Sequence, residues 1–487
     1  MRRREWSRCS SRRGERDRSC SPGGNPRQNL RVKCLLISFH YPPDPAIGAV
    51  RVAAIAEAMG RAGHEVKVVA AAGPASAGPA AGEVVQSPWF DVRTLRLVGP
   101  RASSGNSRRM QRSPERRQHP QPGSNGSGIA DSVSNTRAMR SAFARSITPG
   151  SPLRAAIAKS RGAVLEYPDA MVGWIPGAFH KARRICGTWP CDVVVSSGPP
   201  FSAHVVAAAI AREWGIPWVA DYRDLWTNGT YYDKPDWRRR LDTRLEGRLL
   251  ASTAFVTTVS EPLAGDLRRD FGVKAEVALN GFDDVEVEAF GQREPLSEAR
   301  LNLLFVGNNL YGGRRSPQLL FDAAAQMGLG PNDIRFHFLG TDPEFVAQTA
   351  STAGVADLVA VYPRTSQAES VAMQARADVL MLLMWNHPGE AGVYSGKIYE
   401  YIAVRRPILM VGYPHGVAAD LVRSRSIGWV VSSEASAVEA LGSALSAKHS
   451  SALLQDFDPS LSVGLGRAEQ MTRLVALMES ECAPRPT

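Results

Sequence analysis

The stretch that decides the fold is GVYSGKIYEYIAVRRPIL, from Gly392 to Leu409. Ser395 and Gly396 lie where a helix begins, and the apolar residues that follow at i, i+3 and i+4 spacing give it one buried face. Arg405 and Arg406 are expected to close its last turn, where cations suit the helix dipole. The next residue is a proline, which cannot continue the helix, and the apolar run after it predicts a buried strand.

A helix that starts at the edge of a parallel sheet presents free backbone N–H groups, which attract anions. Lys397 adds a positive charge there, and Glu400, one turn on, can accept hydrogen bonds from two ribose hydroxyls. The stretch therefore fits a site for a nucleoside diphosphate. The alternative is an ordinary helix and strand with a lysine and a glutamate on its surface.

Buried strands and helices alternate twice along the chain, which predicts an α/β protein with two doubly wound parallel sheets. The predicted parts are a basic tail at 1–31, a first domain at 32–285, a polar linker at 286–300, a second domain at 301–461, and a C-terminal helix and tail at 462–487. The first domain carries a basic insert at about 99–150, after a short strand expected at about 92–98. Ligands of such sheets bind at the carboxyl ends of the strands, so the cleft between the domains is the expected site.

The net charge of +11 is concentrated in two segments. Residues 1–31 hold ten arginines against three acidic residues, and residues 101–165 hold twelve lysines and arginines against two. Such segments are usually solvated, disordered chain; anionic lipid and nucleic acid are the alternative partners. Residues 137–165 intersperse apolar side chains with the charges, which fits either a helix at a lipid interface or an exposed segment packed on the domain.

Six cysteines are scattered without a disulfide framework or zinc-ligand spacing, which fits a reducing cytoplasm. No apolar run has the length of a membrane-spanning helix, and the arginine-rich start lacks the apolar core of a signal peptide. We therefore expect a cytoplasmic protein.

Eight segments follow one another between Val32 and Ala447, outside the insert: FHYPPDPAIGAVR, DVVVSSGPPFSAH, GIPWVADYRDLW, VTTVSEPL, NGFD, LLFVGNNLYGGRRSP, ADVLMLL and SGKIYEYIAVRRPIL. In this order they resemble glycosyltransferase family 4, in its branch of bacterial polysaccharide enzymes. The resemblance implies a GT-B fold, in which the second domain binds a nucleotide sugar and the first domain the acceptor. It also implies a transfer that retains anomeric configuration and uses no metal and no cofactor.

A transfer without a metal needs cations and N–H donors around the departing diphosphate. Lys397 and Arg314 or Arg315 would act in catalysis by stabilising the charge of the departing diphosphate. Glu400 matches the ribose-binding carboxylate of the family. The other donor-binding candidates are Gly48, Gly307, Gly392, Ser395 and Gly396. Gly48 is either a point where a phosphate approaches bare backbone or simply a turn.

Two positions depart from the family pattern. Many members carry a second glutamate eight positions before the ribose-binding one, where this chain has Gly392, with Glu390 nearby. The pattern therefore does not identify the donor sugar. Many members also have a histidine near the acceptor, whereas His204 falls inside the following helix, which favours a structural role.

Asp221, Arg223 and Asp224 follow a strand end in the first domain. They form either an ion-pair cluster or part of the acceptor-binding site. No residue is assigned as the general base, because a departing phosphate can itself take the acceptor proton.

The predicted function is the transfer of a sugar from a nucleotide sugar to a lipid-linked saccharide in cell-surface polysaccharide or exopolysaccharide biosynthesis. The enzyme would bind anionic lipid as a peripheral protein at the inner face of the plasma membrane. A non-catalytic sugar-nucleotide-binding protein and a sugar-nucleotide 2-epimerase of the same architecture are the alternatives. No nucleic acid partner is expected, because no aromatic-interleaved basic motif accompanies the charge.

Overall fold

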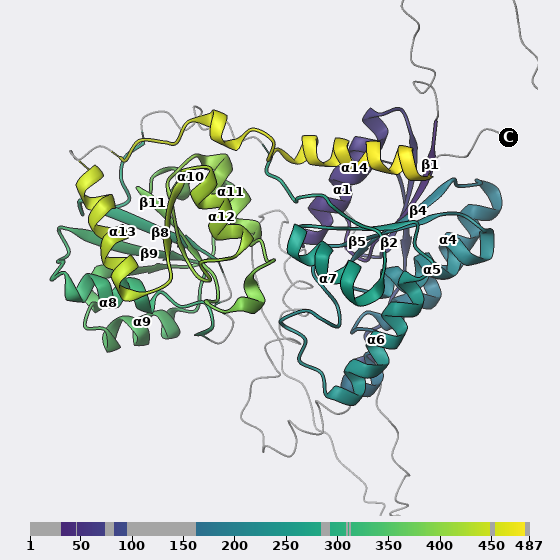
Figure 1. The fold of residues 1–487 in the computed structure, drawn as a ribbon, viewed down its shortest axis with the longest axis horizontal. Helices are drawn as coiled ribbons and strands as arrows, with labels where there is room; N and C mark the ends of the chain where they lie inside the picture. The colour runs from purple at the N-terminus through teal and green to yellow at the C-terminus, as the bar shows by residue number, and fades with distance from the viewer. Residues whose placement is uncertain are drawn as a thin grey trace, which may run out of the picture.

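The computed structural model describes residues 31–44, 46–73, 82–94, 162–283, 293–307, 310, 313–448 and 453–482. The predicted tail up to residue 30, the insert at about 99–150 and the first part of the predicted linker lie outside these residues. The described chain forms two α/β domains, each built on a parallel sheet (Figure 1). This confirms the predicted pair of doubly wound sheets.

The first sheet has seven parallel strands in the order β3-β2-β1-β4-β5-β6-β7. These strands are β1 (Lys33–Ile37), β2 (Glu65–Ala71), β3 (Glu83–Ser87), β4 (Val193–Gly198), β5 (Trp218–Tyr222), β6 (Phe255–Thr258) and β7 (Ala275–Val277). The helices of this domain are α1 (Ile47–Arg61), α4 (Ile175–Thr188), α5 (Ser202–Trp214), α6 (Asp236–Leu250) and α7 (Glu261–Phe271).

Alternate residues of a strand enter opposite layers of the core, because successive side chains point to opposite faces of a sheet. On β1, Leu35 and Ile37 pack in the layer covered by α4 and α5, whereas Cys34 and Leu36 pack in the layer covered by α1. The apolar run of the strand is therefore continuous, as a strand buried on both faces requires.

Two sequence predictions for this domain need correction. The short strand expected at about 92–98 does not begin at Val92, because Val92–Thr94 is a turn of 3-10 helix and the edge strand is β3. The rest of that predicted strand, 95–98, lies outside the described residues. Helix α4 was not predicted, since Pro176 and two glycines weaken its helical pattern. It forms because Ala178, Ala182 and Ile185 are buried against the sheet.

The second sheet has six parallel strands in the order β10-β9-β8-β11-β12-β13. They are β8 (Leu301–Val306), β9 (Ile334–Leu339), β10 (Val359–Tyr362), β11 (Val379–Leu383), β12 (Ile408–Val411) and β13 (Gly428–Val431). The helices are α8 (Gln318–Gln326), α9 (Pro343–Thr352), α10 (Gln367–Ala375), α11 (Gly396–Val404), α12 (Val417–Ser424) and α13 (Glu434–Ala447). Helices α8, α9 and α13 share one core layer with the sheet, and α11 and α12 share the other.

The last helix, α14 (Arg467–Cys482), leaves the second domain and lies along α1 of the first (Figure 1). Its Met471, Leu474 and Met478 are buried in the same layer as Val52 and Ile55 of α1. The chain therefore passes between the domains twice, the second time just before α14. Within the described ranges, no helix combines the length and the apolar character that a bilayer crossing requires.

The end of α11 differs from the prediction. Arg405 is the C-cap residue, with a left-handed φ of 63°. Arg406 is fully buried and lies 2.6 Å from the carboxylate of Asp456, while its guanidinium also donates to the carbonyl of Ala377. Arg406 therefore ties the sheet to the segment after α13 and does not serve the helix dipole.

Candidate active site

Loops that follow the carboxyl ends of strands in both sheets meet at the boundary between the domains. The strand order reverses between β1 and β4 in the first sheet and between β8 and β11 in the second. Such switch points are where open α/β sheets bind ligands. Across the boundary, Thr230 Oγ1 donates to the Gly389 carbonyl and Ser260 Oγ to the Gly392 carbonyl, each at 2.6 Å. The candidate site therefore draws on both domains.

The start of α11 is built as the sequence predicts. The Ser395 side chain accepts a hydrogen bond from the N–H of Lys397 at 3.4 Å, and Gly396 is the first helical residue. Lys397 Nζ lies 2.7 Å from Glu400 Oε2, and the two side chains are 30% and 39% exposed. The predicted phosphate and ribose ligands thus pair with each other. An exposed pair is worth at most about 1 kcal/mol, so a bound phosphate and ribose can replace it.

Arg314 and Arg315 are neighbours in the chain but occupy different surroundings. The exposed Arg314 guanidinium lies 4.7 Å from the centre of the Trp385 ring. The Arg315 side chain is only 13% exposed and lies 3.4 Å from the Glu390 carboxylate. Gly307 follows β8, but its N–H donates to the Leu339 carbonyl at 3.1 Å and is not open to a phosphate. Among the described residues of this loop, Arg315 contacts the other domain at the boundary.

Tyr231, Arg315 and Glu390 form a hydrogen-bonded group that we call the boundary cluster. The Tyr231 hydroxyl of the first domain donates to Glu390 and accepts from Arg315 at 3.2 Å. Burial and the bond to Glu390 raise the pKa of Tyr231 to about 12, so it remains a hydroxyl donor. The Glu390 side chain is 1% exposed, and a carboxylate at that depth needs such partners. Sequence reasoning noted Glu390 only as a neighbour and did not include Tyr231.

Gly392, predicted to bind the donor, is covered by the first domain. A Cβ at this position would lie 2.7 Å from Leu263 Cδ2 and 3.3 Å from Pro262 Cβ, both at the start of α7. In this arrangement the residue forms part of the domain boundary and is not open to a phosphate. A side chain at the position where many family members carry a glutamate would therefore meet the Leu263 side chain in this arrangement.

Gly48 is the second residue of α1, and a guanidinium covers it. A Cβ at Gly48 would lie 1.7 Å from Arg223 Nη1, so only glycine admits this side chain. Arg223 Nε also donates to the Gly198 carbonyl at 3.3 Å. The bare backbone predicted to receive a phosphate thus receives Arg223, which brings a cation to the start of α1.

Asp221 and Asp224 flank Arg223 but differ in their surroundings. Asp221 is fully buried and accepts hydrogen bonds from Arg51, at 2.7 Å, and from the hydroxyls of Ser197 and Thr257. Burial opposes ionisation, but the Arg51 charge and these bonds lower the pKa of Asp221 overall. Asp221 therefore supports the site through Arg51 and is not placed to contact an acceptor directly.

Asp224 keeps an exposed surface while protein surrounds its other sides. This partial burial raises its pKa, against the opposing charges of Arg223 and Arg315. A solvent-accessible carboxylate near cations from both domains is compatible with the predicted acceptor-binding role.

Comparison with known proteins bears on what this site does. Residues 127–281 match the family model described as a glycosyl transferase 4-like domain. The first domain of the chain therefore contains a glycosyl transferase 4-like domain. The matched residues lie in the first domain, whereas Lys397 and Glu400 lie in the second. No curated protein matches the chain.

Solved structures share the fold of this glycosyltransferase at low sequence identity. A glycosyltransferase from Rickettsia africae is 11% identical with a TM-score of 0.54, over 94% of this chain and 100% of that one. Anabaena HepE in complex with UDP is 12% identical with a TM-score of 0.55, over 92% and 100%. Sucrose-phosphate synthase from Thermosynechococcus elongatus is 14% identical with a TM-score of 0.51, over 93% and 97%. At these identities the likeness establishes the GT-B fold.

His204 of this glycosyltransferase lies in α5, fully buried. Its Nδ1 is 2.8 Å from Ser196 Oγ, and its ring stacks on Tyr222. Burial lowers the pKa of His204 to about 3, so the ring is neutral near pH 7. These contacts fit the structural role that its helical position favours.

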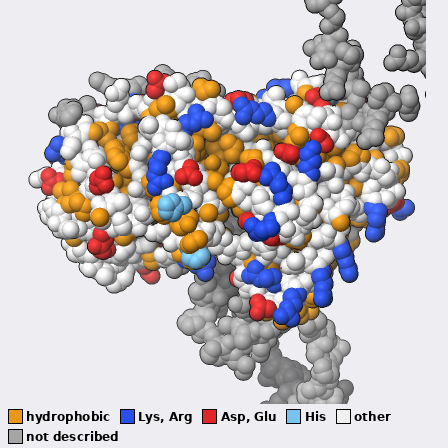
Figure 2. Space-filling model, viewed as in Figure 1, with side chains coloured by type: hydrophobic (Ala, Val, Ile, Leu, Met, Phe, Trp, Pro, Cys, Tyr) orange, Lys and Arg blue, Asp and Glu red, His pale blue; other side chains and the backbone are white. Residues whose placement is uncertain are grey.

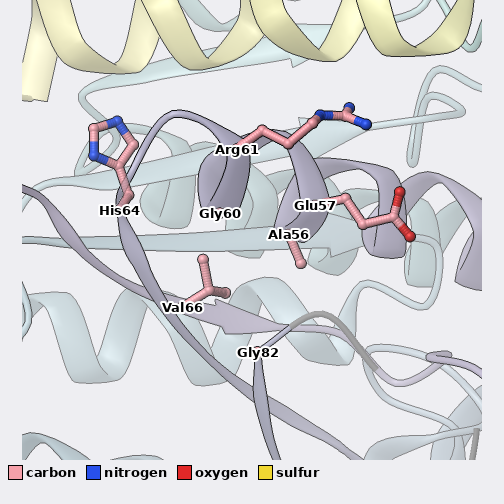
Figure 3. A pocket seen from close by; sticks show the side chains of 7 residues that line it. All are labelled: Ala56, Glu57, Gly60, Arg61, His64, Val66 and Gly82. Atoms are coloured by element: carbon pink, nitrogen blue, oxygen red, sulfur yellow. The ribbon is translucent and has the colours of Figure 1, made fainter. Parts of the chain in front are cut away.

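A cavity of about 410 Å³ lies away from the candidate site (Figure 3). It is lined by Ala56, Glu57, Gly60, Arg61, His64, Val66 and Gly82. These residues lie at the end of α1, around the beginning of β2 and just before β3, which is the amino edge of the sheet. Open α/β sheets bind their ligands at the opposite edge, where the strand order reverses.

Proposed function

We propose that this GT-B glycosyltransferase transfers a hexose from a nucleotide sugar to a saccharide acceptor with retention of anomeric configuration. The observation that carries the proposal is the start of α11, where a capped helix, Lys397 and Glu400 stand together beside the boundary with the first domain. The solved structure of Anabaena HepE with UDP and glucose supports a nucleotide sugar as the donor.

On the donor side, Glu400 binds the ribose hydroxyls, and Lys397 with the amides at Ser395 and Gly396 binds the diphosphate. Arg315 contributes a second cation from the loop after β8, and Arg314 lies farther out against Trp385. These groups act most strongly where negative charge develops on the departing diphosphate. In this proposal they serve in place of a metal ion, and the departing phosphate takes the acceptor proton.

On the acceptor side, Arg223 and Asp224 contact the incoming saccharide, and Asp221 holds Arg51 beneath them. The acceptor is a lipid-linked saccharide used in cell-surface polysaccharide synthesis, which places the enzyme at the inner face of a membrane. The basic segment at residues 101–165 would support attachment to anionic lipid.

Incubation with a panel of nucleotide sugars tests the proposal, with slow release of nucleoside diphosphate and free sugar as the readout. The anomer released, followed by NMR, tests retention. The Glu400→Gln variant is the control: release of nucleoside diphosphate should fall in this variant, whereas release by an unrelated hydrolase in the sample would not change. Binding without turnover would indicate a non-catalytic sugar-nucleotide-binding protein. An epimerised donor would indicate a sugar-nucleotide 2-epimerase.

A further inference from the structure

The outer face of α6 carries a stripe of arginine and apolar side chains. Trp237 is 47% exposed and Leu241 is 41% exposed. Arg240, Arg244 and Arg248 are exposed on the same side, at helical spacing from Trp237. Figure 2 shows lysine and arginine side chains gathered over the part of the first domain where Figure 1 draws α6. We call these five residues the α6 face.

The opposite side of α6 is also charged, but its charges are satisfied inside the protein. Arg238 and Asp242 are each 1% exposed and lie 2.9 Å apart. Glu246 accepts hydrogen bonds from Thr227, in the loop that carries Asp224 and Tyr231. Among the described residues, by contrast, none forms an ion pair with the three arginines of the α6 face. The uncompensated charge of the helix is therefore directed outward.

The basic segment of the chain returns to the fold at α6. Arg238 donates to the carbonyls of Ala163, Glu166 and Pro168. Lys234, which lies just before α6 begins, places its Nζ 3.2 Å from Glu166 Oε2. Residues 162–168, which directly follow the basic stretch 101–161 in sequence, are thus fixed against α6. Tyr167, 38% exposed, adds an aromatic ring beside Leu241 and donates to its carbonyl.

We propose that the α6 face docks this glycosyltransferase on an anionic lipid bilayer. Tryptophan, tyrosine and leucine side chains interleaved with arginine suit the interface, where apolar groups enter the headgroup region and cations meet lipid phosphates. A nucleic acid would satisfy the arginines but would leave Leu241 exposed. Because α6 directly supports the loop of Asp224, docking there brings the proposed acceptor side of the cleft close to the lipid surface.

Flotation of the full chain with vesicles tests this inference. The probes are phosphatidylcholine vesicles with and without phosphatidylglycerol. Binding is expected only with phosphatidylglycerol, and salt should release it because ions screen the charge. Replacing Arg240, Arg244 and Arg248 by Gln should weaken binding by roughly fivefold for each arginine, so on the order of a hundredfold in all.

A matched pair of variants separates the α6 face from exposed arginine and tryptophan in general. Trp237→Ala with Arg240→Gln removes one of each from the α6 face. Arg212→Gln with Trp214→Ala removes one of each from the end of α5, where Trp214 is 42% exposed. Only the first pair should lose vesicle binding. Equal loss from both pairs, or no loss from either, would overturn the assignment.

The inference rests on the proposed function only for its link to the acceptor, so nucleoside diphosphate affinity is measured on the same samples. Normal nucleotide binding without vesicle binding refutes the α6 face and leaves the proposed function standing. Vesicle binding without nucleotide binding supports the α6 face and contradicts the proposed function. Binding of an RNA oligonucleotide that falls in the same variants, with no vesicle binding, would assign the face to nucleic acid.

Discussion

Gly392 lies against the first domain, so we expect a side chain at this position to oppose the contact between the two domains. In the Gly392→Ala variant, the new Cβ would lie 2.7 Å from Leu263 Cδ2, closer than real contacts allow. Overpacking of this kind costs about 1–3 kcal/mol. Because the clash exists only while the domains touch, the cost should shift the equilibrium toward the separated arrangement by roughly 5- to 150-fold.

Small-angle scattering with saturating nucleoside diphosphate measures this shift. The wild type should remain compact, whereas Gly392→Ala should show a larger radius of gyration and lower donor turnover. The circular dichroism of both should agree, since neither core layer is touched.

A second substitution makes the test specific. Leu263→Ala removes the two atoms nearest to the new methyl group, Leu263 Cδ2 and Cγ, so the double variant should recover compaction relative to Gly392→Ala alone. The coupling free energy between residues 392 and 263 is then obtained from the wild type, the two single variants and the double variant. A Gly392→Ala protein that stays compact and active, or a double variant that recovers nothing, would refute this account of the boundary.

Three further predictions concern single side chains. Glu400→Gln should keep the fold and weaken nucleoside diphosphate affinity about tenfold or more by calorimetry, because charge-assisted hydrogen bonds are lost; unchanged affinity contradicts the ribose assignment. Lys397→Ala should lower turnover more than it lowers nucleoside affinity, since its charge acts on the departing group; equal losses of mono- and diphosphate affinity with normal turnover argue against it. Burial raises the pKa of Glu246 to about 7, so its contribution to stability is present below about pH 4.5 and is lost as pH rises through 7. The free energy of unfolding of Glu246→Gln should therefore rise relative to that of the wild type as pH increases, by up to about 3 kcal/mol. Melting temperatures of the two proteins that stay parallel across that range would contradict the raised pKa of Glu246.

The sequence predicts the second sheet well because its strands are short apolar runs separated by clear helical patterns. β8, β9 and β13 have the bounds expected from the sequence. The start of α11 was predictable for the same reason, since a capping serine and an apolar face are local signals. The proximity of Lys397 and Glu400 on this helix then follows from helical spacing alone.

Contacts between distant segments were not predictable in this way. Nothing local distinguishes Arg314 from Arg315; only the fold places Arg315 beside Glu390 and a tyrosine from the other domain. The covering of Gly48 by Arg223 joins positions 175 residues apart, and the sequence alone suggested an open backbone there. Local patterns thus placed the elements, while tertiary packing decided which candidate groups are open to a ligand.

Two ion pairs of the site, Arg51–Asp221 and Lys397–Glu400, differ in how firmly they are fixed, and this difference fits the roles proposed for them. Arg51 and Asp221 are 1% and 0% exposed, and breaking a buried pair costs about 3–5 kcal/mol because one charge is left without a partner. Lys397 and Glu400 are partly exposed, and their separation costs at most about 1 kcal/mol. A substrate can therefore displace the Lys397–Glu400 pair but not the Arg51–Asp221 pair. In the proposed function, the acceptor side would thus be held in a fixed geometry by the Arg51–Asp221 pair, whereas the donor side would open the Lys397–Glu400 pair to receive a ribose and a diphosphate.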